Sequence, residues 1–142
     1  MDLNNYKNFI ELSFGNNKIK YNDMLTKQAS SIKPNIEFKK DPSKLYTIIT
    51  IDPDAPTSSN PIYKYFLHML VVNNSDTLIQ WTGPDPPTGS KTHRYYTCVF
   101  EQVSPIDVNK NHIDSRAKFD LNSFVKSNNL IIKGCDKFRV EG

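Results

Sequence analysis

The sequence predicts a mainly β fold, a sandwich of two antiparallel sheets with one or two short helices. Short runs rich in β-branched and aromatic residues recur along the 142 residues and alternate with turn residues. A single segment, which follows Asp120, has apolar residues at helical spacing. Because the sequence shows no internal repeat and no long linker, we expect residues 1–142 to form a single domain.

Four strands are expected in the first half of the chain. Two alternating runs flank the turn at Gly15–Asn17 and predict a hairpin, which a loop over residues 22–31 follows. The run that precedes Asp52 is apolar on both faces, as is typical of a central strand. The four expected strands are Phe9–Phe14, Lys18–Tyr21, Asn35–Phe38 and Leu45–Ile51.

The second half is expected to hold the longest strand, Tyr63–Val72, and a short helix capped by Asp120. Period-two alternation along the longest strand places one set of side chains on a common face, namely Phe66, His68, Leu70 and Val72. The other expected strands are Thr77–Trp81, His93–Gln102, Leu130–Ile132 and Phe138–Val140.

The charge pattern and the cysteines exclude several classes of protein. The net charge is +3, but no more than two basic residues are adjacent, which indicates a solvated surface and not a nucleic-acid-binding stripe. Cys98 and Cys135 are too few for a disulfide framework or a zinc knuckle, and we expect Cys98 to be an inert buried thiol.

The apolar stretches of the sequence are short. The amino end lacks the hydrophobic core of a signal peptide, and the stretch Phe66–Val72 is far shorter than the ~20 residues of a membrane span. We therefore expect a cytoplasmic monomer without a transmembrane segment.

An acidic turn, Asp52–Pro56, follows the central strand directly. Its two prolines stop the ladder of hydrogen bonds because neither can donate a backbone N–H. The strand thus delivers the carboxylates of Asp52 and Asp54 at its carboxyl end, where a stiff turn can hold them in a cleft.

Three further polar side chains lie on apolar strands. His68 interrupts the longest strand, and His93 and Tyr95 share one face of a later strand. If these strands adjoin, both imidazoles and the phenol converge on Asp52. Each residue also has a structural interpretation: a hydrogen-bonded core histidine, a packing tyrosine or a turn aspartate.

Two motifs extend this interpretation. The first comprises Asp52–Pro56, Pro61 and His68–Asn73, and the second comprises Gly83–Gly89, His93–Tyr95 and Glu101–Gln102. In order and spacing they resemble the two signatures of the phosphatidylethanolamine-binding protein family, which includes Raf kinase inhibitor protein. The similarity extends from about Phe9 to Val140.

The resemblance implies a β-sandwich with Greek-key connections and a small anion pocket at one end. By position the pocket is lined by Asp52, His68, His93 and Tyr95, and its wall contains Asp54, Phe66, Gly83, Asp85 and Pro86. Family members bind phosphate or phospholipid head groups without a cofactor. They modulate protein kinases, proteases or other proteins and are not established enzymes, so a phosphopeptide is a further partner that this pocket implies.

The sequence departs from the family pattern at several positions. Phe66 replaces a tryptophan, Asp85 occupies a loop position that is usually small or neutral, and the carboxyl-terminal helix of longer members is missing. We therefore expect a more open pocket, in which an inward-pointing Asp85 would disfavour an anion.

Protonated histidines would supply both donors and positive charge, so anion binding is expected to tighten as the pH falls from 8 to 6. Arg94 points away from His93 and is expected to tie down Asp54. Two alternatives stay open: a metal enzyme that uses Asp52, His68 and His93 as ligands, and a scaffold with a degenerate pocket.

Overall fold

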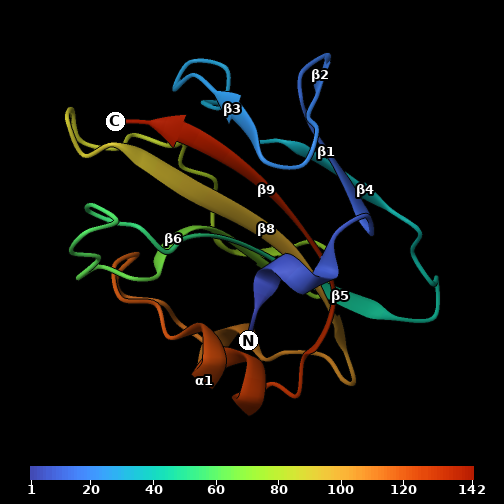
Figure 1. Ribbon diagram of the computed structural model, residues 1–142. Helices are drawn as coiled ribbons and strands as arrows, with labels where there is room; N and C mark the ends of the chain where they lie inside the picture. The colour runs from blue at the N-terminus through green and yellow to red at the C-terminus, as the bar shows by residue number, and fades with distance from the viewer.

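The computed structural model describes all 142 residues and shows two β-sheets with three short helices (Figure 1). The six-stranded sheet has the order β3-β9-β8-β5-β6-β7, and the three-stranded sheet has the order β2-β1-β4. The mainly β fold class is confirmed. The strands are β1 (Ile10–Phe14), β2 (Asn17–Lys18), β3 (Asp23–Leu25), β4 (Asn35–Phe38), β5 (Leu45–Asp52), β6 (Phe66–Val72), β7 (Asp76–Ile79), β8 (Thr92–Gln102) and β9 (Ile131–Glu141).

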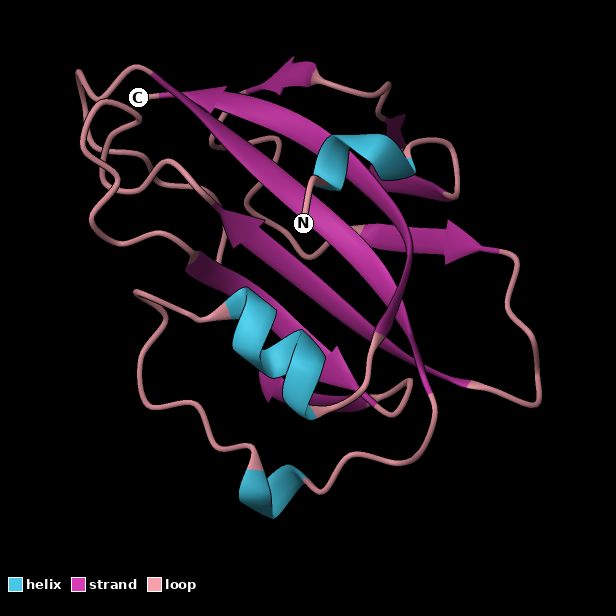
Figure 2. Cartoon of the chain, turned by 60° about the horizontal axis from the view of Figure 1, so that its bottom comes forward, coloured by secondary structure: helices cyan, strands magenta, loops and turns pink.

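Two of the three short helices, η1 (Leu3–Tyr6) and α1 (Leu121–Ser127), pack on one face of the large sheet (Figure 2). The first is a 3-10 helix and the second an α-helix, and the third is the 3-10 helix η2 (Val108–Lys110). Asp120 caps α1 as predicted, because its carboxylate accepts a hydrogen bond from the Ser123 backbone N–H at 3.0 Å. None of these helices is long and apolar enough to cross a membrane.

Apolar side chains cover both faces of the large sheet. On the helical face, Leu3 of η1 and Phe124 of α1 belong to one cluster with Ile49 of β5. On the opposite face, the small sheet places Phe14 with its ring centroid 5.2 Å from that of Phe138, which stacks on Tyr95 at 5.3 Å. Burial on both faces explains why the central strands are apolar throughout.

One edge of the large sheet differs from the expected arrangement. β9 is a single strand, where the sequence predicted two, and the side chain of Phe9 occupies the space that a Cβ at Gly134 would fill. β3 lies within the predicted loop and pairs parallel to β9, with Asp23 opposite Phe138. The prediction of purely antiparallel sheets is therefore wrong at this edge, since a segment of three residues is too short to carry a pattern that reveals a long-range pairing.

A β-bulge in β6 changes the predicted alternation of side chains. Ile51 pairs with Leu67 and Thr50 pairs with Met69, so His68 is the extra residue. Leu67 thereby joins the helical-face cluster to which Leu70 and Val72 also belong, and His68 does not. The prediction that His68 shares a face with Leu70 and Val72 is wrong, because the bulge reverses the alternation.

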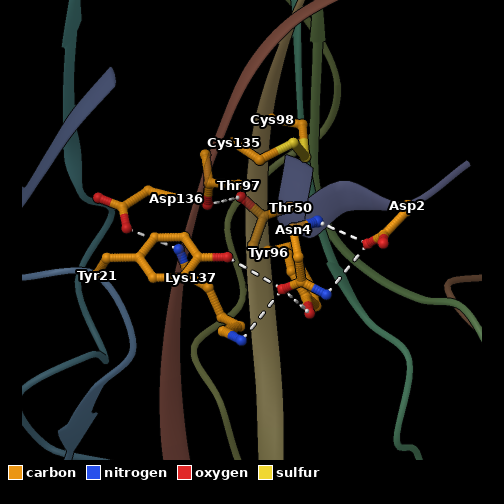
Figure 3. Close-up of a disulfide and its surroundings, with 10 residues drawn as sticks. All are labelled: Asp2, Asn4, Tyr21, Thr50, Tyr96, Thr97, Cys98, Cys135, Asp136 and Lys137. Carbon is orange, nitrogen blue, oxygen red and sulfur yellow. Dashed lines mark hydrogen bonds between the residues drawn. A yellow bond between two sulfur atoms is a disulfide. The ribbon is translucent and has the colours of Figure 1, made fainter. Parts of the chain in front are cut away.

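A disulfide joins Cys98 of β8 to Cys135 of β9, which corrects the prediction that Cys98 is an inert thiol (Figure 3). The two residues lie directly opposite in the β8–β9 register, with their Cα atoms 4.1 Å apart. Beside them, the hydroxyls of Thr50 and Thr97 are 2.7 Å apart. Disulfides are most frequent in oxidising compartments, whereas the cytoplasmic location stays a prediction.

Removal of this disulfide is expected to lower the free energy of unfolding. The bond closes a loop with a sequence separation of 37 residues, for which the chain-entropy relation gives about 4 kcal/mol. Urea unfolding of the oxidised protein and of the Cys98→Ala/Cys135→Ala variant measures the difference. The variant should be insensitive to reductant, and equal unfolding midpoints would contradict the stabilising role.

Candidate functional site

A hollow of about 330 Å³ lies where β5 ends, and most of the predicted pocket residues line it. Its lining includes Asp52, Phe66, His68, Gly83, Asp85, Pro86 and Tyr95. The structure does not place the other two predicted residues, Asp54 and His93, in this lining. Three neighbouring strands and the proline-rich loop thus converge on one hollow.

Asp52 is buried beside the hollow, and both of its carboxylate oxygens are engaged. Oδ2 accepts a hydrogen bond from His93 Nδ1–H at 2.8 Å, and Oδ1 accepts one from the Asp54 backbone N–H at 2.7 Å. The carboxylate is therefore held in a fixed orientation, with a cationic partner whenever His93 is protonated.

His93 lies behind Asp52 and positions it. The imidazole is 1% exposed, and its second nitrogen, Nε2, is 3.0 Å from the Ser90 hydroxyl. Because Nδ1 donates to Asp52, Nε2 of the neutral ring accepts a hydrogen bond from Ser90. The sequence did not lead us to predict Ser90 as a partner of His93, although it lies only three residues before that histidine.

His68 turns one nitrogen toward the hollow. Its Nδ1–H donates to the Thr82 carbonyl at 2.8 Å, and its Nε2 has no hydrogen-bond partner in the protein. Burial lowers the pKa of His68 below 6.5, against the opposing effects of the Thr82 carbonyl and Asp52. At neutral pH the ring is therefore uncharged, and Nε2 carries a lone pair.

Tyr95 places a phenol next to His68, with the two ring centroids 5.2 Å apart in an edge-on arrangement. The Tyr95 hydroxyl makes no hydrogen bond within the protein, and the residue lines the hollow. Burial, and then the carboxylates of Asp52, Asp54 and Asp85, raise the pKa of Tyr95. The phenol thus keeps its proton and is a free donor.

Asp54 connects the acidic turn to β8. Its carboxylate accepts hydrogen bonds from the Arg94 backbone N–H, Nε and Nη2, each at 2.9 Å. Burial acts to raise the pKa of Asp54, but the hydrogen bonds and the charge of Arg94 hold it below its usual value. The structure gives Asp54 a tethering position in place of the expected wall position.

The proline-rich loop forms the outer wall. A Cβ at Gly83 would come within 2.9 Å of the Ser31 Cα, so only glycine fits this close approach without a shift. Asp85 lies at the mouth, where its side chain is 88% exposed and 3.4 Å from Lys27 Nζ. Its charge is therefore screened by solvent and partly offset by Lys27.

A second, larger hollow of about 680 Å³ lies beside the first, over β6 and β7, and contains no histidine or carboxylate. Trp81 lines it, and Thr82 and Gly83 line the first hollow. The Trp81 Nε1–H donates to the Ser31 carbonyl at 3.3 Å, and both residues line the larger hollow. The histidine and the carboxylates in its lining single out the smaller hollow as the candidate site.

The arrangement of Asp52, His68 and His93 can be compared with that of a metal site, the alternative that the sequence left open. No group of three or more His, Cys, Asp or Glu side chains is arranged to hold a metal ion. His93 is bonded to Asp52 through one nitrogen and to Ser90 through the other, so Asp52, His68 and His93 do not converge as three free ligands.

Comparison with known families gives one match over most of the chain. A family model described as phosphatidylethanolamine-binding protein matches residues 13–132. A phosphatidylethanolamine-binding protein homologue of Acanthamoeba polyphaga mimivirus is 36% identical over 105 residues, covering 70% of this chain and 73% of the relative. A Drosophila melanogaster protein named for odorant binding is 31% identical over 106 residues, covering 66% of this chain and 50% of the relative's length.

Two solved structures share the fold. Carboxypeptidase Y inhibitor, solved in complex with its cognate proteinase, has a TM-score of 0.83 at 22% identity, covering 93% of this chain and 82% of that one. The phosphatidylethanolamine-binding protein of Plasmodium vivax has a TM-score of 0.75 at 19% identity, covering 92% and 83%.

The neutral burial of His68 predicts a loss of stability in acid. The unfolded chain binds a proton near pH 6.5 and the folded His68 does so only at lower pH, so the free energy of unfolding falls as the pH drops below 6.5 toward the lower folded-state pKa. Asp136 has the opposite sign, because burial raises its pKa to about 6.

The measurement is therefore a comparison of variants by urea unfolding between pH 7.5 and 5.5. His68→Asn, which keeps a donor for the Thr82 carbonyl, should show a smaller loss of stability in acid than the wild type. Replacement of the exposed His112 by Asn is the matched control. A pH dependence that is unchanged in His68→Asn would contradict this assignment.

Arg94→Ala is expected to lower the free energy of unfolding by about 2 kcal/mol or more, because the buried Asp54 carboxylate loses its partner. Phosphate affinity should change little, since neither residue lines the hollow. Arg139→Ala, opposite Arg94 in the β8–β9 register, is the control. A binding loss at unchanged stability would show that Arg94 acts in the site.

Proposed function

The chain belongs to the phosphatidylethanolamine-binding protein family, and we propose that its pocket binds a phosphate monoester or phospholipid head group between His68 and Tyr95. We further propose that it modulates a protein partner, such as a kinase or protease, and is not an enzyme. Carboxypeptidase Y inhibitor, which shares the fold and is bound to a proteinase, supports the second part as an analogy.

The unpaired polar atoms in the hollow carry this proposal. Tyr95 offers a hydroxyl donor, and His68 offers an unpartnered Nε2, while both oxygens of Asp52 are already engaged. A buried site that leaves two polar atoms open to a small hollow fits a ligand that supplies the missing hydrogen bonds.

The protonation states specify the form of the ligand. Neutral His68 accepts at Nε2, so it matches a phosphate monoanion whose P–OH donates to that nitrogen. The charged oxygens of the same group accept from Tyr95. A dianion has no such proton and binds only to the imidazolium. The second pKa of a phosphomonoester is ≈ 6, so both a monoanion on neutral His68 and a dianion on the imidazolium need one proton more than the dianion and the neutral ring carry together. Binding is therefore expected to tighten as the pH falls.

The acidic residues around the hollow are compatible with an anion because each has a partner. Asp52 is bonded to His93, Asp54 is bonded to Arg94, and Asp85 lies beside Lys27 at the rim. An unpaired carboxylate at 4 Å would instead repel a unit negative charge by ~4 kcal/mol at an effective dielectric of 20.

The expected affinity is modest. Two or three charge-assisted hydrogen bonds at ~1.5–3 kcal/mol each, less the cost of association, give a dissociation constant in the millimolar to micromolar range for a bare head group. A tighter physiological complex needs additional surface, which a protein partner bearing a phosphate or carboxylate supplies.

Titration calorimetry with phosphoethanolamine tests the binding function. Affinity should rise as the pH falls from 8 to 6, and Tyr95→Phe should weaken binding by about tenfold through loss of one hydrogen bond to a charged group. Tyr6→Phe, in η1 on the opposite face, is the matched control. Affinity that is flat or rises with pH counts against the proposal, and no detectable binding favours a scaffold with a degenerate pocket.

A further inference from the structure

Arg116, in the segment before α1, connects β6 to the start of the proline-rich loop. Its Nη1–H donates to the carbonyls of Leu67 and His68 at 3.2 and 3.1 Å, and its Nη2–H donates to the carbonyl of Gln80 at 2.8 Å. Its own carbonyl accepts from the Leu67 N–H at 2.7 Å. The side chain and backbone of Arg116 thus form hydrogen bonds with three residues around the bulge, Leu67, His68 and Gln80.

The guanidinium adds side-chain donors next to the bulge. β6 and β7 pair from Leu70 and Ile79 onward, and nearer the bulge the Thr82 N–H donates to the His68 carbonyl at 3.0 Å. Arg116 gives one further donor to each of the carbonyls of Leu67, His68 and Gln80. Arg116 supplies these donors and stabilises the bulge that turns His68 toward the hollow.

The same network determines the orientation of the imidazole. The His68 carbonyl accepts from both Arg116 and the Thr82 N–H, the latter at 3.0 Å, and the His68 Nδ1–H donates back to the Thr82 carbonyl at 2.8 Å. A change at Arg116 is transmitted to the position of Nε2 through these bonds.

Arg116 is also a cation without an acidic partner. No carboxylate lies within salt-bridge distance of it, unlike Arg94, which is neutralised by Asp54. Its side chain is half-buried and its guanidinium stays charged at any physiological pH.

We propose that Arg116 is the positioning residue of this pocket and its permanent positive charge: it holds the His68 bulge and attracts the anion without touching it. This inference rests on the proposed anion-binding function. It explains how a hollow lined by two aspartates and no lysine or arginine can favour a negative ligand.

The other charged or titratable groups near His68 do not replace this charge. Asp52 from β5 and Asp85 from the proline-rich loop are negative, and Tyr95 from β8 keeps its proton. His93 from β8 is bonded to Asp52. Arg116 also disfavours protonation of His68, which reinforces the effect of burial on the pKa of His68.

Three variants test the proposal by titration with inorganic phosphate at pH 7 and low ionic strength. Arg116→Gln should weaken binding roughly tenfold, the effect expected of a unit charge several ångströms from an anion near a protein surface. Arg116→Lys, which keeps the charge, should recover most of the affinity. Lys126→Gln removes one exposed charge on α1 and is the control for net charge, so its affinity should match the wild type.

A second measurement follows the His68 ring by NMR across pH 5 to 8. Its pKa should rise in Arg116→Gln and stay at the wild-type value in Lys126→Gln. Equal phosphate affinity in Arg116→Gln and the wild type would overturn the proposal, and so would an Arg116→Lys variant as weak as Arg116→Gln. If Arg116→Gln does not fold, the His68 ring signals of Arg116→Lys decide the positioning role, because a lysine keeps the charge but cannot donate to three carbonyls in the same geometry. Ring signals that differ from the wild type support this role, and identical signals overturn it.

Different results would overturn the proposed function and the proposed role of Arg116. Absence of phosphate binding by the wild type removes the proposed function and, with it, the attraction of an anion by Arg116. A raised His68 pKa in Arg116→Gln would then still support the electrostatic effect of Arg116 on His68, and a His68 ring signal displaced in Arg116→Lys would still support its positioning role. Phosphate binding that is insensitive to both Arg116 substitutions overturns this inference and leaves the proposed function intact.

Discussion

The antiparallel pairing of β5 with β8 is the constraint on which the rest of the site depends. The ladder runs from Leu45 opposite Gln102 to Ile51 opposite Tyr96, and the acidic turn begins immediately afterwards. Beyond the last backbone pair, side chains continue the contact between the strands: Asp52 binds His93 and Asp54 binds Arg94. Both buried carboxylates thus act as connectors between neighbouring strands.

The pocket combines rigid outer parts with an open centre. No buried side-chain nitrogen or oxygen in the chain lacks a hydrogen-bond partner. The Tyr95 hydroxyl and His68 Nε2 make no bond to the protein and face the hollow instead. Hydrogen bonds from Ser90, Thr82 and Arg116 hold the surrounding groups in place, so the hollow is preorganised.

Local patterns predicted most of the strands and the residues that converge. Alternation and β-branched content located β4 and β5 to within one residue, and the capping aspartate located α1. The spacing of the two motifs identified Asp52, His68 and Tyr95 as neighbours. Patterns of this kind work where one face of an element is buried, since burial imposes a period on the sequence. Local sequence patterns did not predict the Arg116 network, because an isolated arginine in a loop has no periodic neighbours.

By itself, the sequence determined the mainly β class, the order of most of the elements and the proximity of Asp52, His68 and Tyr95, because these follow from local propensity and motif spacing. Only the tertiary structure decided the β8–β9 register that joins Cys98 to Cys135, the parallel pairing of β3 and the bulge at His68. It also separated the roles of the two histidines, with His93 behind Asp52 and His68 at the hollow. Each of these features is a relation between segments far apart in the chain, and register between distant strands is set by packing of the whole core and not by the residues of either strand alone.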